Sequence, residues 1–97
     1  MTLSAKQRAK LRSLAHPLKP IAQVGKEGVT ESFLSGLLEN FTSRELLKVK
    51  VQGGAPITAA EAGEQIADRL PDVHHVQTIG RTVVLYRRHP EKPEVDL

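Results

Sequence analysis

One segment of the sequence combines a short apolar strand, a glycine turn and an amphipathic helix: residues 21–41, IAQVGKEGVTESFLSGLLENF. The first four of these residues predict a buried strand, and Thr30 is well placed to cap the helix that follows. The apolar positions that recur at helical spacing are Val29, Phe33, Leu34, Leu37, Leu38 and Phe41. The segment therefore predicts a strand, a turn and a helix in direct succession.

The turn Gly25-Lys26-Glu27-Gly28 has the pattern G-x-x-G at the start of this helix. A helix N-terminus carries partial positive charge and unpaired N–H groups, and glycine has no side chain to keep a phosphate away. The motif alone is weak, because many glycine turns only connect a strand to a helix. The basic residues around it favour an anion site.

A first helix is predicted over residues 5–15, upstream of the strand. Ser4 and Gln7 have the spacing of a capping box, and Leu3, Leu11 and Leu14 form the apolar stripe. Basic side chains flank the stripe, Lys6 and Lys10 on one side and Arg8 and Arg12 on the other. Two prolines, at positions 17 and 20, end this helix.

The second half of the chain predicts a strand, a helix and a hairpin. Residues 46–51, LLKVKV, alternate apolar side chains with Lys48 and Lys50, so one sheet face is apolar and the other is basic unless a helix covers it. Thr58 and Glu61 suggest a second capping box, for a helix that ends at Pro71. The inner stripe of this helix is Ala59, Ala62, Ile66 and Leu70. Residues 74–79 and 82–87 alternate around Gly80-Arg81, which suits a two-residue type II′ turn.

The predicted fold is of the α/β class (α+β two-layer): a mixed four-stranded sheet with three helices, in the order α-β-α-β-α-β-β. Two strand–helix–strand crossovers predict parallel pairs, and the hairpin predicts an antiparallel pair. Residues 1–88 are expected to form one domain, because 97 residues leave no room for a second core. Residues 89–97, HPEKPEVDL, have little to bury and are predicted to be disordered.

Charge is divided unequally between the two halves of the chain. Residues 1–50 contain nine basic and four acidic residues, whereas residues 51–97 contain five basic and seven acidic ones. This asymmetry favours a polyanion or an anionic membrane surface as partner. The sequence has no cysteine, which excludes disulfides and thiolate zinc sites. An apolar signal core and a membrane-spanning run are both absent, so a cytoplasmic location is expected.

Five ordered blocks of this sequence resemble the bacterial YhbY family, whose members are a single CRM domain, named for chloroplast RNA splicing and ribosome maturation. The blocks are LSAKQ (3–7), LAHPLKP (14–20), GKEG (25–28), ELLKVK (45–50) and IGRTVVLYR (79–87). The resemblance implies an RNA-binding domain similar in fold to the C-terminal domain of initiation factor three, with a glycine loop like that of KH domains. It also implies an association with precursors of the large ribosomal subunit.

Structured RNA is therefore the expected partner, in particular ribosomal RNA of large-subunit precursors, bound by a monomer without a cofactor. The residues expected to contact RNA are Lys6, Arg8, Lys10, Arg12, Lys19, Gly25, Lys26 and Gly28. Phe33 and Phe41 are expected in the core, which leaves no aromatic platform for stacking bases. Readout of splayed bases normally uses such side chains, so binding through backbone and shape is predicted.

Other classes of function are less well supported by the sequence. Glu61, Glu64 and Asp68 share a helical face, but acidic residues on an outer helix face are usually solvated. His74 and His75 are neighbours on a strand, so they point to opposite faces and are poorly placed to share a metal ion. Neither a catalytic nor a metal site is predicted. A ribosome-associated adaptor that binds acidic protein is the main alternative, and membrane-surface binding is the third.

Overall fold

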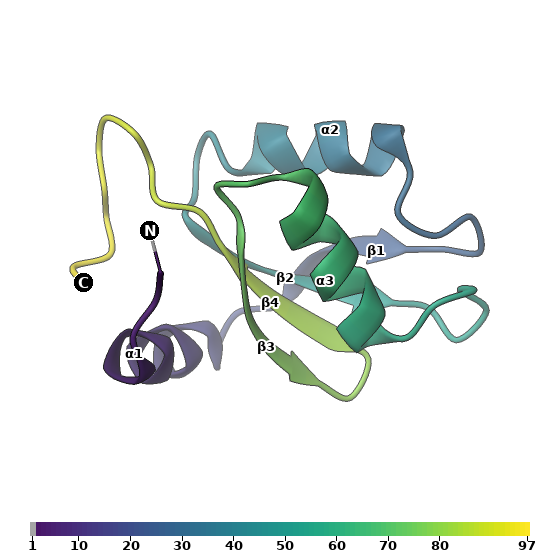
Figure 1. The fold of residues 1–97 in the computed structure, drawn as a ribbon, viewed down its shortest axis with the longest axis horizontal. Helices are drawn as coiled ribbons and strands as arrows, with labels where there is room; N and C mark the ends of the chain where they lie inside the picture. Colours follow the sequence, from purple (N-terminus) through teal and green to yellow (C-terminus); the bar gives the residue numbers. More distant parts are fainter. Residues whose placement is uncertain (1) are drawn as a thin grey trace.

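The computed structural model describes residues 2–97 and has the predicted order of elements (Figure 1). The helices are α1 (Ala5–Ala15), α2 (Glu31–Asn40) and α3 (Ala59–Arg69). The strands are β1 (Pro20–Val24), β2 (Leu46–Val51), β3 (His74–Ile79) and β4 (Thr82–Tyr86). The predicted α+β class, with a mixed four-stranded sheet and three helices, is confirmed.

The strands are arranged in the order β1-β2-β4-β3. β1 and β2 are parallel, and β4 is antiparallel to both of its neighbours. The sequence predicted that each strand–helix–strand crossover joins two strands that pair in parallel. This is wrong for the crossover through α3, because β4 lies between β2 and β3. β4 is buried on both faces from Val83 to Tyr86, which suits a central strand, whereas β3 is largely half-buried and forms an edge.

Each face of the sheet has its own core. α2 and α3 cover one face, and their main core contains Phe41, Leu47, Val49, Ile66 and Leu85 among others. α1, at the lower left of Figure 1, packs on the opposite face over a smaller core. The smaller core consists of Leu3, Leu11, Ala15, Leu46, Val76, Val84 and Tyr86. A single helix, α1, covers this second face, whereas two helices cover the first, so part of the second face is left open.

Two leucines of the predicted helical stripes lie outside the cores. Leu14 is 43% exposed, and Ala15 is buried in its place beside Leu11. At about 100° per residue, the position four residues after Leu11 returns closer to the same face than the position three residues after it. Leu38 is 38% exposed on the outer side of α2. The remaining stripe residues are buried or pack against the cores.

The predicted helix caps and hairpin turn are confirmed. The Ser4 hydroxyl accepts from the Gln7 backbone N–H at 3.1 Å, while the Gln7 side chain accepts from the Ser4 N–H. Thr58 and Glu61 make the same reciprocal pair at the start of α3. Gly80 has a φ of +56°, as the first central residue of a type II′ turn requires.

Residues 89–97 contain no helix or strand and fold back beside the start of β2. The buried Glu45 carboxylate accepts from the backbone N–H groups of His89 at 2.7 Å and of Glu94 and Val95 at 2.6 Å each. Val95 also packs against the smaller core. The composition argument took no account of these contacts. Disorder of residues 89–97 stays a prediction, and truncation after Arg88 tests it.

Candidate nucleic-acid interface

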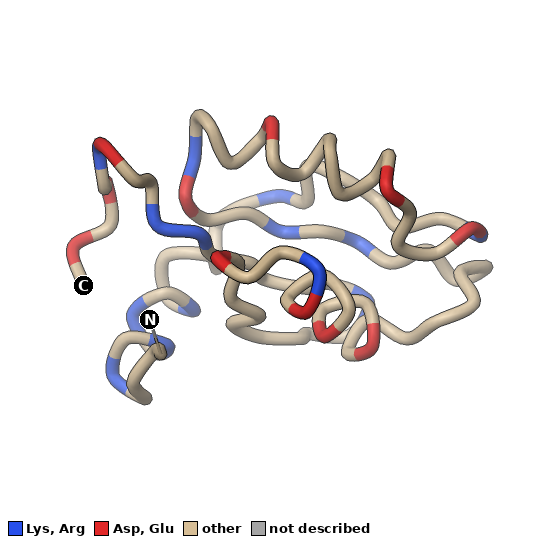
Figure 2. Tube along the Cα trace, turned by 45° about the horizontal axis from the view of Figure 1, so that its top comes forward, with Lys and Arg blue, Asp and Glu red and all other residues tan. Residues whose placement is uncertain are grey.

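Charge is separated between the two faces of the sheet (Figure 2). α1 carries four basic residues and no acidic one, whereas α2 and α3 together carry five acidic residues and one basic residue. On β2, Leu47, Val49 and Val51 enter the main core, so Lys48 and Lys50 point to the side of the sheet on which α1 lies. The side of the sheet that α1 covers is therefore basic, and the side that α2 and α3 cover is acidic.

Lys48 and Lys50 connect α1 to the glycine turn across the open part of the sheet. Lys48 Nζ donates to the backbone carbonyl of His16, just after α1, at 3.2 Å. Lys50 is exposed and lies opposite Gln23 of β1, which immediately precedes the last residue of that strand. The sequence alternation indicated a basic face here. The sheet register, which brings that face beside the glycine turn, was not deducible from the alternation.

The glycine turn is closed by a hydrogen bond of its own. The Gly28 N–H donates to the Gly25 carbonyl at 3.0 Å, so it is used within the turn. Two further residues separate the turn from α2, where Thr30 Oγ1 accepts from the Phe33 N–H at 3.1 Å. The Gly28 N–H is therefore not available to an anion, and an anion site at this turn stays a prediction. The turn exposes Lys26.

The four cations of α1 have different surroundings. Lys6 and Arg12 are exposed. Arg8 is half-buried, and its Nη1 donates to the backbone carbonyl of His75 at 2.9 Å and to that of Val76 at 3.4 Å. Lys10 Nζ donates to the backbone carbonyl of Asp96 in the C-terminal segment. Within residues 2–97, Lys6 and Arg12 are thus the cations of α1 that donate to no backbone carbonyl.

The eight predicted site residues do not meet at one point. α1 and the glycine turn lie toward opposite ends of the long dimension of the molecule, which measures 36 Å (Figure 1). Lys19 is exposed in the segment that leads from α1 to β1. The interface is therefore an extended surface, here called the basic face, rather than a single pocket. The basic face is defined here by six cations, each exposed or half-buried: Lys6, Arg12, Lys19, Lys26, Lys48 and Lys50.

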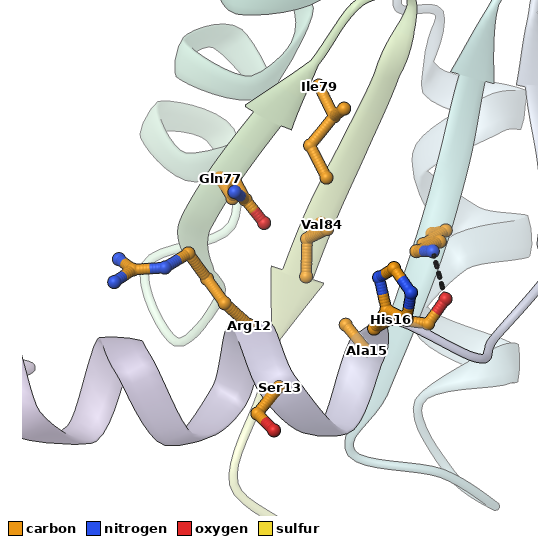
Figure 3. A pocket seen from close by; sticks show the side chains of 8 residues that line it. Arg12, Ser13, Ala15, His16, Gln77, Ile79 and Val84 are labelled. Carbon is orange, nitrogen blue, oxygen red and sulfur yellow. Dashed lines mark hydrogen bonds between the residues drawn. The ribbon is translucent and has the colours of Figure 1, made fainter.

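A hollow of about 480 Å³ lies in the middle of the basic face, between α1 and the open part of the sheet (Figure 3). Its lining residues are Arg12, Ser13, Ala15, His16, Lys48, Gln77, Ile79 and Val84. No local pattern in the sequence predicts this hollow, because its residues come from α1, from His16 just after it, and from β2, β3 and β4. Only the packing of α1 against one end of the sheet creates it.

The two adjacent histidines point to opposite faces of the sheet, as predicted. His74 stacks on Tyr86 with ring centroids 6.1 Å apart, and His75 Nε2 lies 2.7 Å from Thr78 Oγ1 beside Gly63 of α3. Burial lowers the pKa of both imidazoles, so neither adds charge at neutral pH. Within residues 2–97, three or more potential metal ligands are nowhere grouped, and none of the helices is long and apolar enough to span a membrane.

This fold and this site define a small α+β domain with one polycationic face and a G-x-x-G turn before its second helix. The chain belongs to the CRS1 / YhbY (CRM) domain family, whose family model matches residues 3–87. The match confirms the resemblance seen in the five sequence blocks.

Individual relatives cover nearly the whole chain. It is 38% identical over 95 residues to the "Probable RNA-binding protein YqeI" of Bacillus subtilis, with 98% of each chain covered. It is 40% identical over 90 residues to an "RNA-binding protein" of Haemophilus influenzae, with 93% of this chain and 90% of that protein covered. The solution structure of a hypothetical protein from Staphylococcus aureus matches with a TM-score of 0.75 and 34% identity, over 99% of both chains.

Proposed function

We propose that this protein binds structured RNA through its phosphate backbone and shape, and that its RNA is the ribosomal RNA of large-subunit precursors during ribosome assembly. The observation that carries the proposal is the separation of charge, with the cations on the α1 side of the sheet and most helical acids on the other side. The names of the relatives, which describe RNA-binding proteins, support RNA as the polyanion.

Binding on the basic face follows from the distribution of its cations. Lys48 and Lys50 stand on a strand in the middle of the sheet, and Lys6 and Arg12 stand on a helix packed against it. Rigid elements hold these charges at fixed spacings, which suits the regular phosphates of an RNA helix. Phe41 and Tyr86 are fully buried, so they provide no platform for stacked bases. Backbone contacts are therefore expected to supply most of the affinity.

The salt dependence of binding gives this proposal a magnitude. Each neutralised phosphate contributes about 0.7 to 0.9 to the slope of log affinity against log salt. If five of the six cations of the basic face contact phosphates, the expected slope is about −4. An affinity that responds only weakly to salt would contradict backbone recognition.

Lys50→Ala and Arg69→Ala test the location of the interface with matched losses of one positive charge. Lys50 is exposed on the basic face, whereas Arg69 lies on α3 and pairs with Glu31 of α2 on the opposite side. Fluorescence anisotropy with a labelled hairpin RNA should show weaker binding and a slope reduced by about 0.8 for Lys50→Ala. Arg69→Ala should leave both unchanged. Equal effects would show that net charge, rather than this face, governs binding.

Two further measurements test the partner. Titration with an acidic polypeptide such as polyglutamate should give no comparable binding, and preference for it over RNA would favour the protein adaptor. Crosslinking in cells followed by sequencing should enrich precursors of large-subunit ribosomal RNA. Reads distributed in proportion to the abundance of each RNA would refute the ribosomal target while leaving RNA binding intact.

A further inference from the structure

The hollow between α1 and the open sheet has a lining unlike that of a phosphate site. Ala15 and Val84 lie beneath its floor and are fully buried, so the exposed apolar surface of the hollow comes from Ile79, which is 50% exposed and forms one wall. Phosphates are strongly hydrated and gain nothing from an apolar wall, whereas the two faces of a nucleobase are apolar. The volume of about 480 Å³ is within the usual range for small-molecule sites.

Polar groups stand around this floor. The Gln77 side chain extends into the hollow from β3, and the His16 ring stands at its edge (Figure 3). Within residues 2–97, the Gln77 amide has no hydrogen-bond partner. An amide offers one donor group and one acceptor, as the edge of a base requires, and an imidazole ring is one of the surfaces on which unpaired bases stack.

Cations complete the arrangement. Lys48 lines the hollow while donating to the His16 carbonyl, and Arg12 lies on the α1 side with its guanidinium directed outward. A base seated on the floor would leave its own phosphate and the adjacent ones near the rim. Those phosphates would meet the same basic face that binds the rest of the RNA backbone.

We infer that the hollow receives one unpaired nucleobase of the bound RNA. The base packs against the exposed side chain of Ile79, Gln77 hydrogen-bonds to its edge, and the flanking phosphates contact Arg12 and Lys48. This inference rests on the proposed function, and it adds one position of base contact to a surface that otherwise binds backbone. RNA with a bulged nucleotide is therefore preferred over a fully paired helix.

Two hairpin RNAs of the same stem sequence, one fully paired and one with a single bulged nucleotide, test this preference with the full chain. Anisotropy titrations should give about tenfold tighter binding of the bulged RNA, at nearly equal salt slopes, because a stacked base adds an uncharged contact. Equal affinities would overturn the inference and leave the proposed function standing. Failure to bind either RNA would overturn both.

A double variant identifies the residues responsible. Gln77→Ala/Ile79→Ala should abolish the preference for the bulged RNA while the affinity for the paired RNA stays the same. Leu38→Ala, at an exposed leucine on the opposite side of the molecule, is the control and should keep the preference. A double variant that folds, as judged by circular dichroism, and still prefers the bulged RNA would overturn the inference.

A measurement on the unaltered protein avoids any loss of folding. In NMR titrations, the bulged RNA should shift the side-chain amide signals of Gln77 and the methyl signals of Ile79. The fully paired RNA should shift mainly signals of the surrounding lysines. Identical shifts of Gln77 and Ile79 with both RNAs would contradict an occupied base site.

Discussion

Replacement of Glu45 by glutamine is predicted to release the C-terminal segment, residues 89–97. The resulting loss in free energy of unfolding should not exceed the free energy with which this segment docks on the domain. The Glu45 carboxylate accepts three backbone N–H groups from residues 89–95, and an amide in its place would turn one acceptor into a donor that faces those N–H groups. Once the segment leaves, the side chain at position 45 returns to water. The loss is therefore limited by the docking free energy.

The magnitude follows from opposing contributions. Hydrogen bonds to a charged group contribute about 2 kcal/mol each, or about 6 kcal/mol for three, and half-burial of Val95 adds about 1 kcal/mol. Fixing the backbone of the seven residues 89–95 costs about 7 kcal/mol at the low end of the usual range. These contributions nearly cancel, so we expect a docking free energy within about 1 kcal/mol of zero. For a domain of this size, that corresponds to about 4 to 8 °C at most.

Thermal unfolding of four proteins tests this reasoning: the full chain and a chain ending at Arg88, each with Glu45 and with Glu45→Gln. The two changes should not be additive, because each removes the same contacts. Glu45→Gln should leave the melting temperature of the shortened chain unchanged. If the substitution destabilises both chains equally, Glu45 does not act through the C-terminal segment. If neither change has an effect and the backbone ¹⁵N relaxation of residues 89–97 shows fast motion, the predicted disorder is confirmed.

The pH dependence of the same comparison has a definite sign. Burial raises the pKa of the Glu45 carboxyl. The hydrogen bonds from the backbone N–H groups of His89, Val95 and Glu94 together lower it by more than burial raises it, so the pKa lies below the ordinary value. A carboxyl with a lowered pKa in the folded state stabilises that state above its unfolded pKa of about 4.3. The stability advantage of the full chain over the shortened one should therefore shrink as the pH falls below about 4. An advantage that grows on acidification would refute the assignment.

Glycine substitutions give further predictions, whose effects on stability are measured by thermal unfolding and whose effects on RNA affinity are measured by anisotropy titration. Gly63→Ala in α3 should destabilise the protein by about 1 to 3 kcal/mol, because the new Cβ would lie 2.6 Å from the His75 ring. Gly36→Ala in α2 should stabilise the protein by up to about 1 kcal/mol, because the new Cβ would meet no atom within 4 Å. Gly28→Asp should cost about 1 kcal/mol because Gly28 has a φ of +76°, and it should weaken RNA binding more than Lys26→Ala does. Normal folding with unchanged affinity in Gly28→Asp would show that the turn is only a connection.

The local elements were predictable because their signals are local. The capping pair of Ser4 and Gln7 and the alternation through Lys48 and Lys50 can be read from a few neighbouring residues. The insertion of β4 between β2 and β3 depends on competition between whole strands for the buried centre of the sheet, which no short window contains. Glu45 illustrates the same limit, because its partners lie 44 to 50 residues away and donate through their backbones.

The candidate interface was predictable in its charge and not in its shape. The excess of basic residues in the first half of the chain indicated which segments carry the cations of the candidate interface. The sequence did not show that Arg8 is bound to β3 or that the Gly28 N–H is used within its own turn. Both depend on which carbonyl groups lie nearby after folding. Residues lining the hollow, such as Gln77 and Ile79, have no distinctive spacing in the sequence.

The contact of Arg8 with β3 also bears on aggregation. An edge strand presents unpaired carbonyl and N–H groups to which a strand of another molecule can add. On β3, the Arg8 guanidinium occupies the carbonyls of His75 and Val76, and a bulge interrupts the register at the same place. β1, at the other edge, begins with Pro20, which has no N–H to donate. We therefore expect this arginine of the basic helix to oppose edge-to-edge assembly of the protein in concentrated solution.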